Sequence, residues 1–199
     1  PLSLDISKPA VFCICGVYLY KHLADELAWQ YSLYGIFLPY EKRLVDSAGE
    51  QDESSWPSVE EMAADYVNAI LARQPQGPYR LAGVSFGGVV AFEIAQQLRR
   101  AGHHVECVAL LDSMLSGAVR RKPLLGLLRT VAVATGSWVG RWSRRPADRS
   151  APQLSADRLL ADRRETIYKK AIREYRPQFY PGKVVLARAG DEKLRFDQV

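Results

Sequence analysis

The stretch GPYRLAGVSFGGVVAFEIAQQLRRAGHHVECVALLDS, residues 77–113, carries most of the information about the fold. Residues 79–84 form a short apolar run of strand-forming residues, and residues 105–111 form a second one. Between them, residues 87–100 have the apolar spacing of a helix, and residues 101–104 have the composition of a turn. This order of elements predicts an α/β fold in which helices cover both faces of a mostly parallel sheet.

The chain before this stretch continues the alternation of strand and helix. Residues 10–15 (AVFCIC) and 32–38 (SLYGIFL) have strand composition, and residues 19–28 between them are patterned like a helix. Residues 39–55 are polar and without period, which is typical of an exposed loop. The first part of the chain is therefore expected to form a β-α-β unit of the same sheet.

A second helix is expected directly before the central stretch. Ser58 followed by Glu61 three residues later is the sequence pattern of a capping box, and the apolar spacing continues to about Arg73. Far downstream, residues 183–189 resume the strand pattern. We therefore expect residues 1–199 to form one domain.

The regular alternation is interrupted after the central stretch. Residues 113–175 hold a segment rich in Leu, Val, Trp and Arg, then a Ser/Pro/Arg loop, then a helical pattern over about residues 155–175. A mostly helical insertion between two core strands is the form that a lid over an active site takes. We therefore predict a lid insertion over residues 113–175.

The pentapeptide GVSFG, residues 83–87, matches the GxSxG pattern of a nucleophile elbow. Its predicted context, a strand before and a helix after, is the one that such a turn requires, and it would raise the Ser85 hydroxyl above the carboxyl edge of the sheet. A phosphate-binding turn is the alternative, but GVSFGG lacks both glycine-rich phosphate motifs. Ser85 is thus the predicted nucleophile, with the Phe86 N–H as one oxyanion donor. The second donor is expected from Gly16 or Val17, with Val17 preferred.

With these motifs, residues 77–113 closely resemble the thioesterase domains that end nonribosomal peptide synthetases and polyketide synthases, in the α/β-hydrolase superfamily. Residues 9–27 are similar to the family's first core strand and helix, with a shortened glycine-rich loop, and residues 180–189 resemble its next core strand. SFGG after the elbow is more like the chain-terminating domains than the separate editing thioesterases.

The resemblance implies a function and a partner. In that family the serine attacks the thioester that joins an acyl, polyketide or peptidyl chain to the phosphopantetheine of an acyl or peptidyl carrier protein. The chain is then released by hydrolysis or cyclisation, and the domain needs no cofactor of its own. The alternatives are a lipase or carboxylesterase that acts on free esters, and a non-catalytic module that docks a carrier protein.

The acid of the catalytic triad has two candidates. The resemblance implies Asp112, whereas many other α/β-hydrolases place the acid where Asp191 lies, and we favour Asp112. The triad order is serine, acid, histidine, but His22, His103 and His104 all precede Asp112. We therefore expect the histidine, with a further strand and a final helix, to follow residue 199, and the chain alone to hydrolyse little.

Charge is distributed unevenly along the chain, whose net charge is +5. The excess is concentrated in the predicted lid rather than along one recognition helix, which does not favour a nucleic-acid partner. Because carrier proteins are typically acidic, Arg144 and Arg145 are candidates for carrier docking by electrostatic steering. The alternative is a solvated helix whose arginine stems cover apolar surface.

Composition argues against several other classes of protein. No stretch is apolar enough to span a membrane, and the first residues do not have the pattern of a secretion signal, so a cytoplasmic location is expected. Cys13 and Cys15 lack the spacing of a zinc or redox site, and no second pair would complete four ligands, so no metal is expected.

Overall fold

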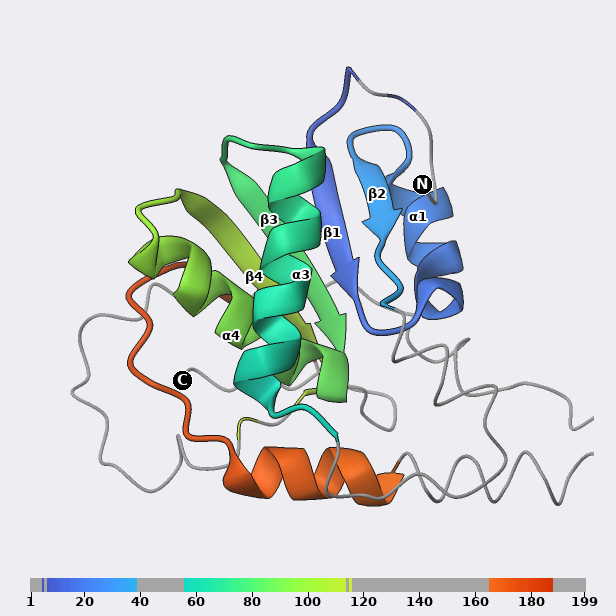
Figure 1. Ribbon diagram of the computed structural model, residues 1–199. Coiled ribbons are helices and arrows are strands. Elements are labelled where there is room, and N and C mark those ends of the chain that lie inside the picture. Colours follow the sequence, from blue (N-terminus) through green and yellow to red (C-terminus); the bar gives the residue numbers. More distant parts are fainter. Residues whose placement is uncertain (1–4, 6, 39–55, 114, 116–164, 188–199) are drawn as a thin grey trace, which may run out of the picture.

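The computed structural model describes residue 5 and residues 7–38, 56–113, 115 and 165–187. A parallel sheet runs through this part of the chain, with five strands in the order β2-β1-β3-β4-β5 (Figure 1). The strands are β1 (Ala10–Ile14), β2 (Ser32–Gly35), β3 (Tyr79–Val84), β4 (Val105–Leu111) and β5 (Val184–Ala187). The α/β fold class and the parallel sheet predicted from the sequence are therefore confirmed.

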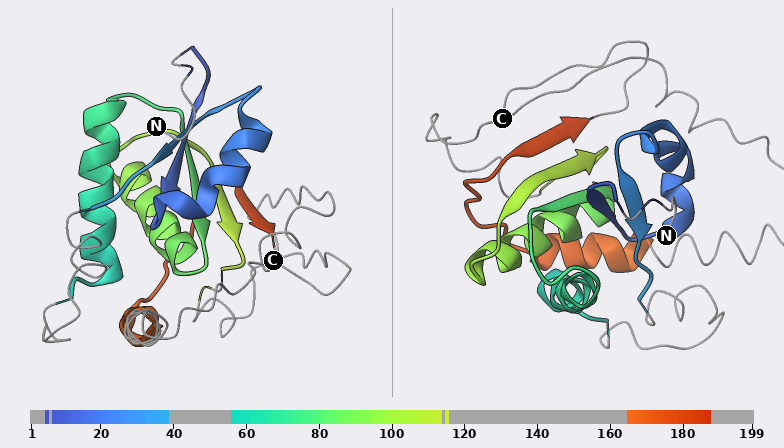
Figure 2. Two further views of the ribbon diagram at one scale, coloured as in Figure 1. Left: turned by 90° about the vertical axis from the view of Figure 1, so that its right-hand side faces the viewer. Right: turned by 90° about the horizontal axis from the view of Figure 1, so that it is seen from above.

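Helices pack against both faces of the sheet. On one face lie α3 (Val59–Arg73) and α4 (Phe86–Arg100), and on the other face lies the short α1 (Lys21–Leu27), which follows the 3-10 helix η1 (Val17–Tyr20) (Figures 1 and 2). Successive strand residues alternate between the faces, as the pleat requires. In β1, Phe12 and Ile14 belong to the core with α3 and α4, whereas Cys13 belongs to the core with α1.

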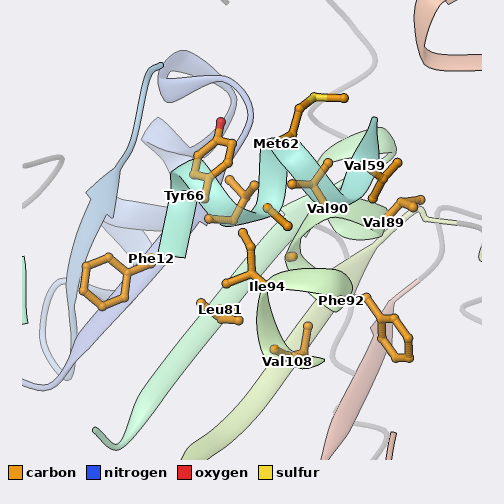
Figure 3. Packing of buried hydrophobic residues seen from close by; sticks show 14 of the residues in the cluster. Phe12, Val59, Met62, Tyr66, Leu81, Val89, Val90, Phe92, Ile94 and Val108 are labelled. Carbon is orange, nitrogen blue, oxygen red and sulfur yellow. The ribbon is translucent and has the colours of Figure 1, made fainter. Parts of the chain in front are cut away.

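Helix α4 forms the centre of the larger core. Most of its residues are buried, including Val89, Val90 and Ile94, which lie between the sheet residue Leu81 and helix α3 (Figure 3). Gly88 near its amino end lets the helix lie close to β3, because a Cβ there would lie 3.0 Å from the Gly83 carbonyl oxygen. The helix that carries the residues after the elbow is thus fixed between the sheet and α3.

The predicted capping box fixes the start of α3. The Ser58 N–H donates to the Glu61 carboxylate at 2.8 Å, and the Glu61 N–H donates to the Ser58 hydroxyl at 3.2 Å. The hydrogen bond from Ser58 lowers the pKa of Glu61, because it favours the charged carboxylate. Helix α3 ends at Arg73, as the sequence predicts.

A further helical segment, residues 165–174, lies at the carboxyl ends of the strands, below α3 and α4 in Figure 1 and in the left view of Figure 2. It belongs to the predicted helix over residues 155–175. Of the rest of the predicted lid, only residues 113, 115 and 175 are described. Residues 39–55 and 188–199 also lie outside the described residues. The lid therefore stays a prediction.

The remaining boundaries differ slightly from the predictions. Strand β1 ends at Ile14 instead of residue 15, and β2 ends at Gly35 instead of residue 38. Within the described sheet, β2 pairs only with β1. The last pair between these two strands is Cys13 opposite Gly35, and β2 ends at that pair. The helix predicted over residues 19–28 begins earlier, as η1, and α1 ends at Leu27.

None of the helices in the described ranges is both long and apolar enough to cross a membrane.

Candidate active site

Ser85 occupies a sharp turn between β3 and α4. Its backbone has φ 52° and ψ −119°, a conformation that side chains other than glycine rarely adopt. The turn is held by a hydrogen bond of 2.8 Å from the Ser85 N–H to the Leu111 carbonyl at the end of β4. The Ser85 side chain is exposed, whereas its neighbour Phe86 is buried. The residue predicted as nucleophile is thus presented to solvent at the carboxyl edge of the sheet.

The glycines around Ser85 allow the strand and helix to approach closely. A Cβ on Gly83 would lie 2.2 Å from the Gly87 carbonyl oxygen, and a Cβ on Gly88 would lie 2.0 Å from the Ser113 hydroxyl oxygen. Neither position has room for a side chain. The GxSxGG pattern is therefore a steric requirement of this turn.

Three residues with unusual backbone surround the site. In the described part of the chain, the non-glycine residues with positive φ are Cys15, Ser85 and Asp112, and they directly follow β1, β3 and β4. These three strands are neighbours in the sheet. Such conformations cost on the order of 1–3 kcal/mol each and cluster at functional sites. The carboxyl ends of parallel strands are also where α/β sheets bind ligands.

Ser85 and Asp112 open into the same cavity, which has a volume of about 470 Å³. Asp112 is exposed, and its N–H donates to the Ala187 carbonyl at 2.7 Å, which ties it to the end of β5. The cavity is lined by Ser85, Phe86, Val89, Asp112, Lys169, Ile172 and Arg173. The structure thus brings the predicted nucleophile and the favoured acid together.

The loop after β1 lies against the start of α4. A Cβ on Gly87 would lie 2.5 Å from the Ile14 carbonyl oxygen and 3.2 Å from the Cys15 Cβ. Phe86 is the first residue of α4, where backbone N–H groups have no acceptor within the helix. Val17 is the first residue of η1, close to this loop. Among described residues, however, Phe86 lines the cavity and neither Gly16 nor Val17 does.

Two buried tyrosines fix the strand ends at the site, and the sequence did not reveal their roles. The Tyr20 hydroxyl donates to the Ile14 carbonyl at 2.6 Å and accepts from the Val84 N–H at 3.0 Å, so it joins the ends of β1 and β3. The Tyr66 hydroxyl, from α3, accepts from the Cys15 N–H at 3.0 Å. Both residues lie in segments predicted as helical, but Val84 and Cys15, which donate to them, are 64 and 51 residues away in the sequence.

The helical segment 165–174 forms one wall of the cavity and is attached to α4 near the nucleophile. The Tyr168 ring stacks on the Phe86 ring, with centroids 4.0 Å apart and an angle of 6° between the planes. Ile172 from this segment and Val89 from α4 both line the cavity. The position of this wall relative to Ser85 therefore depends on α4.

A buried polar network attaches the end of the same segment to the middle of α4. The Tyr175 hydroxyl donates to the Glu93 carboxylate at 2.8 Å, and the Gln96 amide donates to both groups. The Arg100 guanidinium pairs with the other Glu93 oxygen at 2.5 Å. Burial, with the Glu93 charge, raises the pKa of Tyr175, so its hydroxyl remains a proton donor.

The histidines lie away from the cavity. His22 is exposed on α1, and His103 and His104 precede β4, at the opposite end of the strand from Asp112. His103 packs edge-on against Tyr79. The chain has three histidines, all of them in described segments, and none lines the cavity.

The other predicted site residues, Asp191, Arg144 and Arg145, lie outside the described residues. Cys13 is buried in the sheet, and burial raises the pKa of its thiol. Within the described ranges, no group of three or more His, Cys, Asp or Glu side chains is arranged to hold a metal ion.

An exposed serine on a strained turn between strand and helix, next to an aspartate at the end of the following strand, defines an α/β-hydrolase-like protein. The family model described as "Thioesterase domain" matches residues 13–169, which is more than half of the chain. The chain therefore belongs to the thioesterase domain family.

Comparisons with known proteins agree with the type of thioesterase predicted from the sequence. The chain is 34% identical over 117 residues to a dimodular nonribosomal peptide synthase of Bacillus subtilis, matching 57% of this chain and 5% of that protein. It is 58% identical over 48 residues to a non-reducing polyketide synthase of Gibberella zeae, matching 24% of this chain and 2% of that protein. The chain thus spans a small fraction of the length of these relatives.

A solved structure shares the fold. The thioesterase domain of NocB, in a covalent complex with a fluorophosphonate analogue of nocardicin G, has a TM-score of 0.58 at 24% identity. The match covers 90% of this chain and 70% of that one. The chain is thus a thioesterase domain that resembles those of nonribosomal peptide and polyketide synthases.

Proposed function

We propose that this chain releases an acyl, polyketide or peptidyl chain from the phosphopantetheine thioester of a carrier protein, through an acyl-enzyme on Ser85. The observation that supports this most is the opening of an exposed, strained Ser85 into the cavity that Asp112 also lines. The walls of that cavity near Ser85 include Phe86, Val89 and Ile172, which suit an acyl chain.

The chemistry follows from these positions. The Ser85 oxygen attacks the thioester carbonyl carbon, and the negative charge that develops on the carbonyl oxygen is stabilised by the Phe86 N–H and by Val17 or Gly16. The C–S bond breaks, the Ser85 ester forms, and the pantetheine thiol leaves with the proton of the serine. Water or a nucleophile within the bound chain then cleaves the ester.

The proton transfers require a base, since a serine hydroxyl is a weak nucleophile by itself. We assign this role to a histidine outside residues 1–199, and the role of holding that histidine to Asp112. If Asp112 has this role, Asp112→Asn in the intact protein is expected to lower kcat on the order of 10⁴-fold. Full activity in Asp112→Asn together with loss of activity in Asp191→Asn would instead identify Asp191 as the acid that holds the histidine.

The test is the turnover of matched substrates by the intact protein that carries this chain. We expect acyl-carrier thioesters to be hydrolysed or cyclised faster than short free esters, and Ser85→Ala to remove the activity. Ser7→Ala, three residues before β1 and outside the lining of the cavity, is the control and should remain active. A preference for free esters would instead indicate a lipase or carboxylesterase, and carrier binding without turnover would indicate a docking module.

Docking of the carrier is a separate part of the proposal. Charge reversal at Arg144 and Arg145 is expected to weaken binding of the acidic carrier, and the loss should shrink as salt is added. Unchanged carrier affinity at low salt would exclude electrostatic steering by these two residues.

A further inference from the structure

Two cations lie on one wall of the cavity that holds Ser85. Lys169 and Arg173 are four residues apart on the helical segment 165–174, so they share one face of it, and both line the cavity together with Ile172. Apart from Ser85 and Asp112, the other described lining residues are apolar. The proposed chemistry on Ser85 uses neither cation.

The two cations differ in how their charges are paired. The Lys169 ammonium forms an ion pair with Glu165 at 2.5 Å on the same helix. The Arg173 Nε donates to the Lys169 carbonyl at 3.3 Å, and no carboxylate among the described residues pairs with its guanidinium. A guanidinium has five N–H donors in a planar fork, so most of the donors of Arg173 remain available to a ligand.

The wall that carries these cations is held at two points. Tyr168, one position before Lys169, stacks on Phe86, and Tyr175, two positions after Arg173, is bound in the Glu93 network. Both contacts are made to α4, the helix that begins directly after Ser85. The helical backbone that carries the two cations is therefore held in position relative to the nucleophile.

We infer that Arg173, assisted by Lys169, forms a subsite for an anionic group of the substrate, a carboxylate or a phosphate. The inference rests on the proposed function, because the ligand enters the cavity as the substrate of Ser85. A guanidinium suits such a ligand, since its paired N–H groups match two oxygens of a carboxylate or a phosphate. Asp112 is the competing anion in the cavity, and the proposed function commits it to the histidine.

Two sources can supply such an anion. A carboxylate can come from the released chain itself, and a phosphate can come from the phosphopantetheine arm. In a purely structural role, Lys169 and Arg173 would cover apolar surface with their stems and leave their charges in water. The two sources and the structural role predict different ligand preferences.

The test compares binding of stable thioether analogues to the Ser85→Ala form of the intact protein by calorimetry. The thioether analogue of hexanoyl-pantetheine is neutral, those of succinyl- and adipoyl-pantetheine add a carboxylate to the chain, and that of hexanoyl-phosphopantetheine adds the phosphate. We expect one anionic class to bind roughly five- to tenfold more tightly than the neutral analogue, as a charge-assisted hydrogen bond in an open cavity would give. Arg173→Gln should remove this preference and leave the affinity for the neutral analogue unchanged.

Lys170→Gln is the matched control, because it removes a neighbouring positive charge that does not line the cavity. A preference for the succinyl or adipoyl analogue assigns the subsite to the released chain, and a preference for the phosphorylated analogue assigns it to the arm. Equal affinity for all analogues, or a preference that Arg173→Gln and Lys170→Gln reduce alike, would overturn the subsite and leave the proposed function standing. Absence of binding by every analogue would contradict both.

Discussion

In the part of the chain that the structure describes, strained backbone is concentrated at three non-glycine residues, and each directly follows one of three neighbouring strands. Cys15, Ser85 and Asp112 have φ between 50° and 55° and follow β1, β3 and β4. Their backbone N–H groups donate to surrounding acceptors, which are the Leu111 carbonyl for Ser85 and the Ala187 carbonyl for Asp112. The strain is tolerated because a strand directly before each residue and these hydrogen bonds hold it in place, and Ser85 and Asp112 open into one cavity.

Because the turn at Ser85 requires glycine, we expect a glycine-to-alanine substitution in α4 to lower stability, whereas such substitutions in helices usually raise it. Replacing a glycine inside a helix by alanine ordinarily stabilises a protein by about 1 kcal/mol. Because a Cβ on Gly88 would lie 2.0 Å from the Ser113 hydroxyl oxygen and 2.6 Å from its Cβ, we expect Gly88→Ala to destabilise the fold by about 2 kcal/mol. Urea unfolding measures this change.

Ser113→Gly provides the matched background for that test. If the clash is the cause, the cost of Gly88→Ala should fall clearly in a Ser113→Gly protein, which a double-mutant cycle reports as a coupling energy. An equal cost in both backgrounds would show that Ser113 is not the obstacle.

The Tyr20 hydroxyl is expected to stabilise the site as well as the fold. Tyr20→Phe leaves the Val84 N–H and the Ile14 carbonyl without this partner in the interior, which should cost about 1–3 kcal/mol of unfolding free energy. Turnover should also fall, because these groups end the strands that carry Ser85 and the loop at residues 15–17. Tyr18→Phe, at a side chain that is 92% exposed, should change neither quantity.

At the scale of the elements, the helical segment 165–174 depends on α4 for its position. Tyr175→Phe removes the hydroxyl from the buried network with Glu93 and Gln96, and we expect a loss of about 1–2 kcal/mol. Amide hydrogen exchange should rise in residues 165–174 before it rises in the sheet. Uniform protection across the domain, with unchanged stability, would show that the network does not hold the segment.

The segment between this helix and β5 gives a prediction on pH. The Tyr180 hydroxyl is buried with no hydrogen-bond partner among the described residues, and burial raises the pKa of Tyr180 to about 12 from its ordinary value of 10.0. The unfolded chain therefore ionises first, and stability should fall as pH rises from 10 towards 12, by up to about 1.4 kcal/mol per pH unit.

Tyr180→Phe should remove this part of the alkaline loss. Because the hydroxyl lacks a partner, the variant should be at least as stable as the parent at pH 7. Urea unfolding of both proteins from neutral to alkaline pH measures the difference, and parallel curves would contradict the assignment.

The helices and strands predicted most accurately are those whose bounds depend only on their own residues and the residues directly beside them in the sequence. Strands β3 and β4 are runs of mostly apolar, strand-forming residues, and the capping box at Ser58 is complete within four residues, so their bounds matched. The end of β2 was predicted too late, because it depends on where its neighbour β1 stops. The residues of β2 alone do not show where its pairing with β1 ends.

At the scale of the whole molecule, the parallel sheet brings together residues that are distant in sequence. The pairing of Ser85 with Asp112 could be predicted, because an elbow motif and a strand end identify both. A helix over residues 155–175 in a lid was predicted, but the packing of residues 165–174 against α4 was not, and neither were the roles of the tyrosines that hold the strand ends. Both depend on contacts between elements far apart in the chain.

The central claim, that Ser85 is the nucleophile of a carrier-dependent thioesterase, has one direct test. An acyl fluorophosphonate forms a stable bond with a nucleophilic serine and releases fluoride, and trypsin then yields the peptide of residues 81–99. In that peptide, Ser85 is the only side chain with a hydroxyl, thiol or amine. We expect the label on this peptide of the intact protein, slower labelling when acyl-loaded carrier protein competes, and none in Ser85→Ala. Label on another peptide, or equal labelling of Ser85→Ala, would contradict the claim.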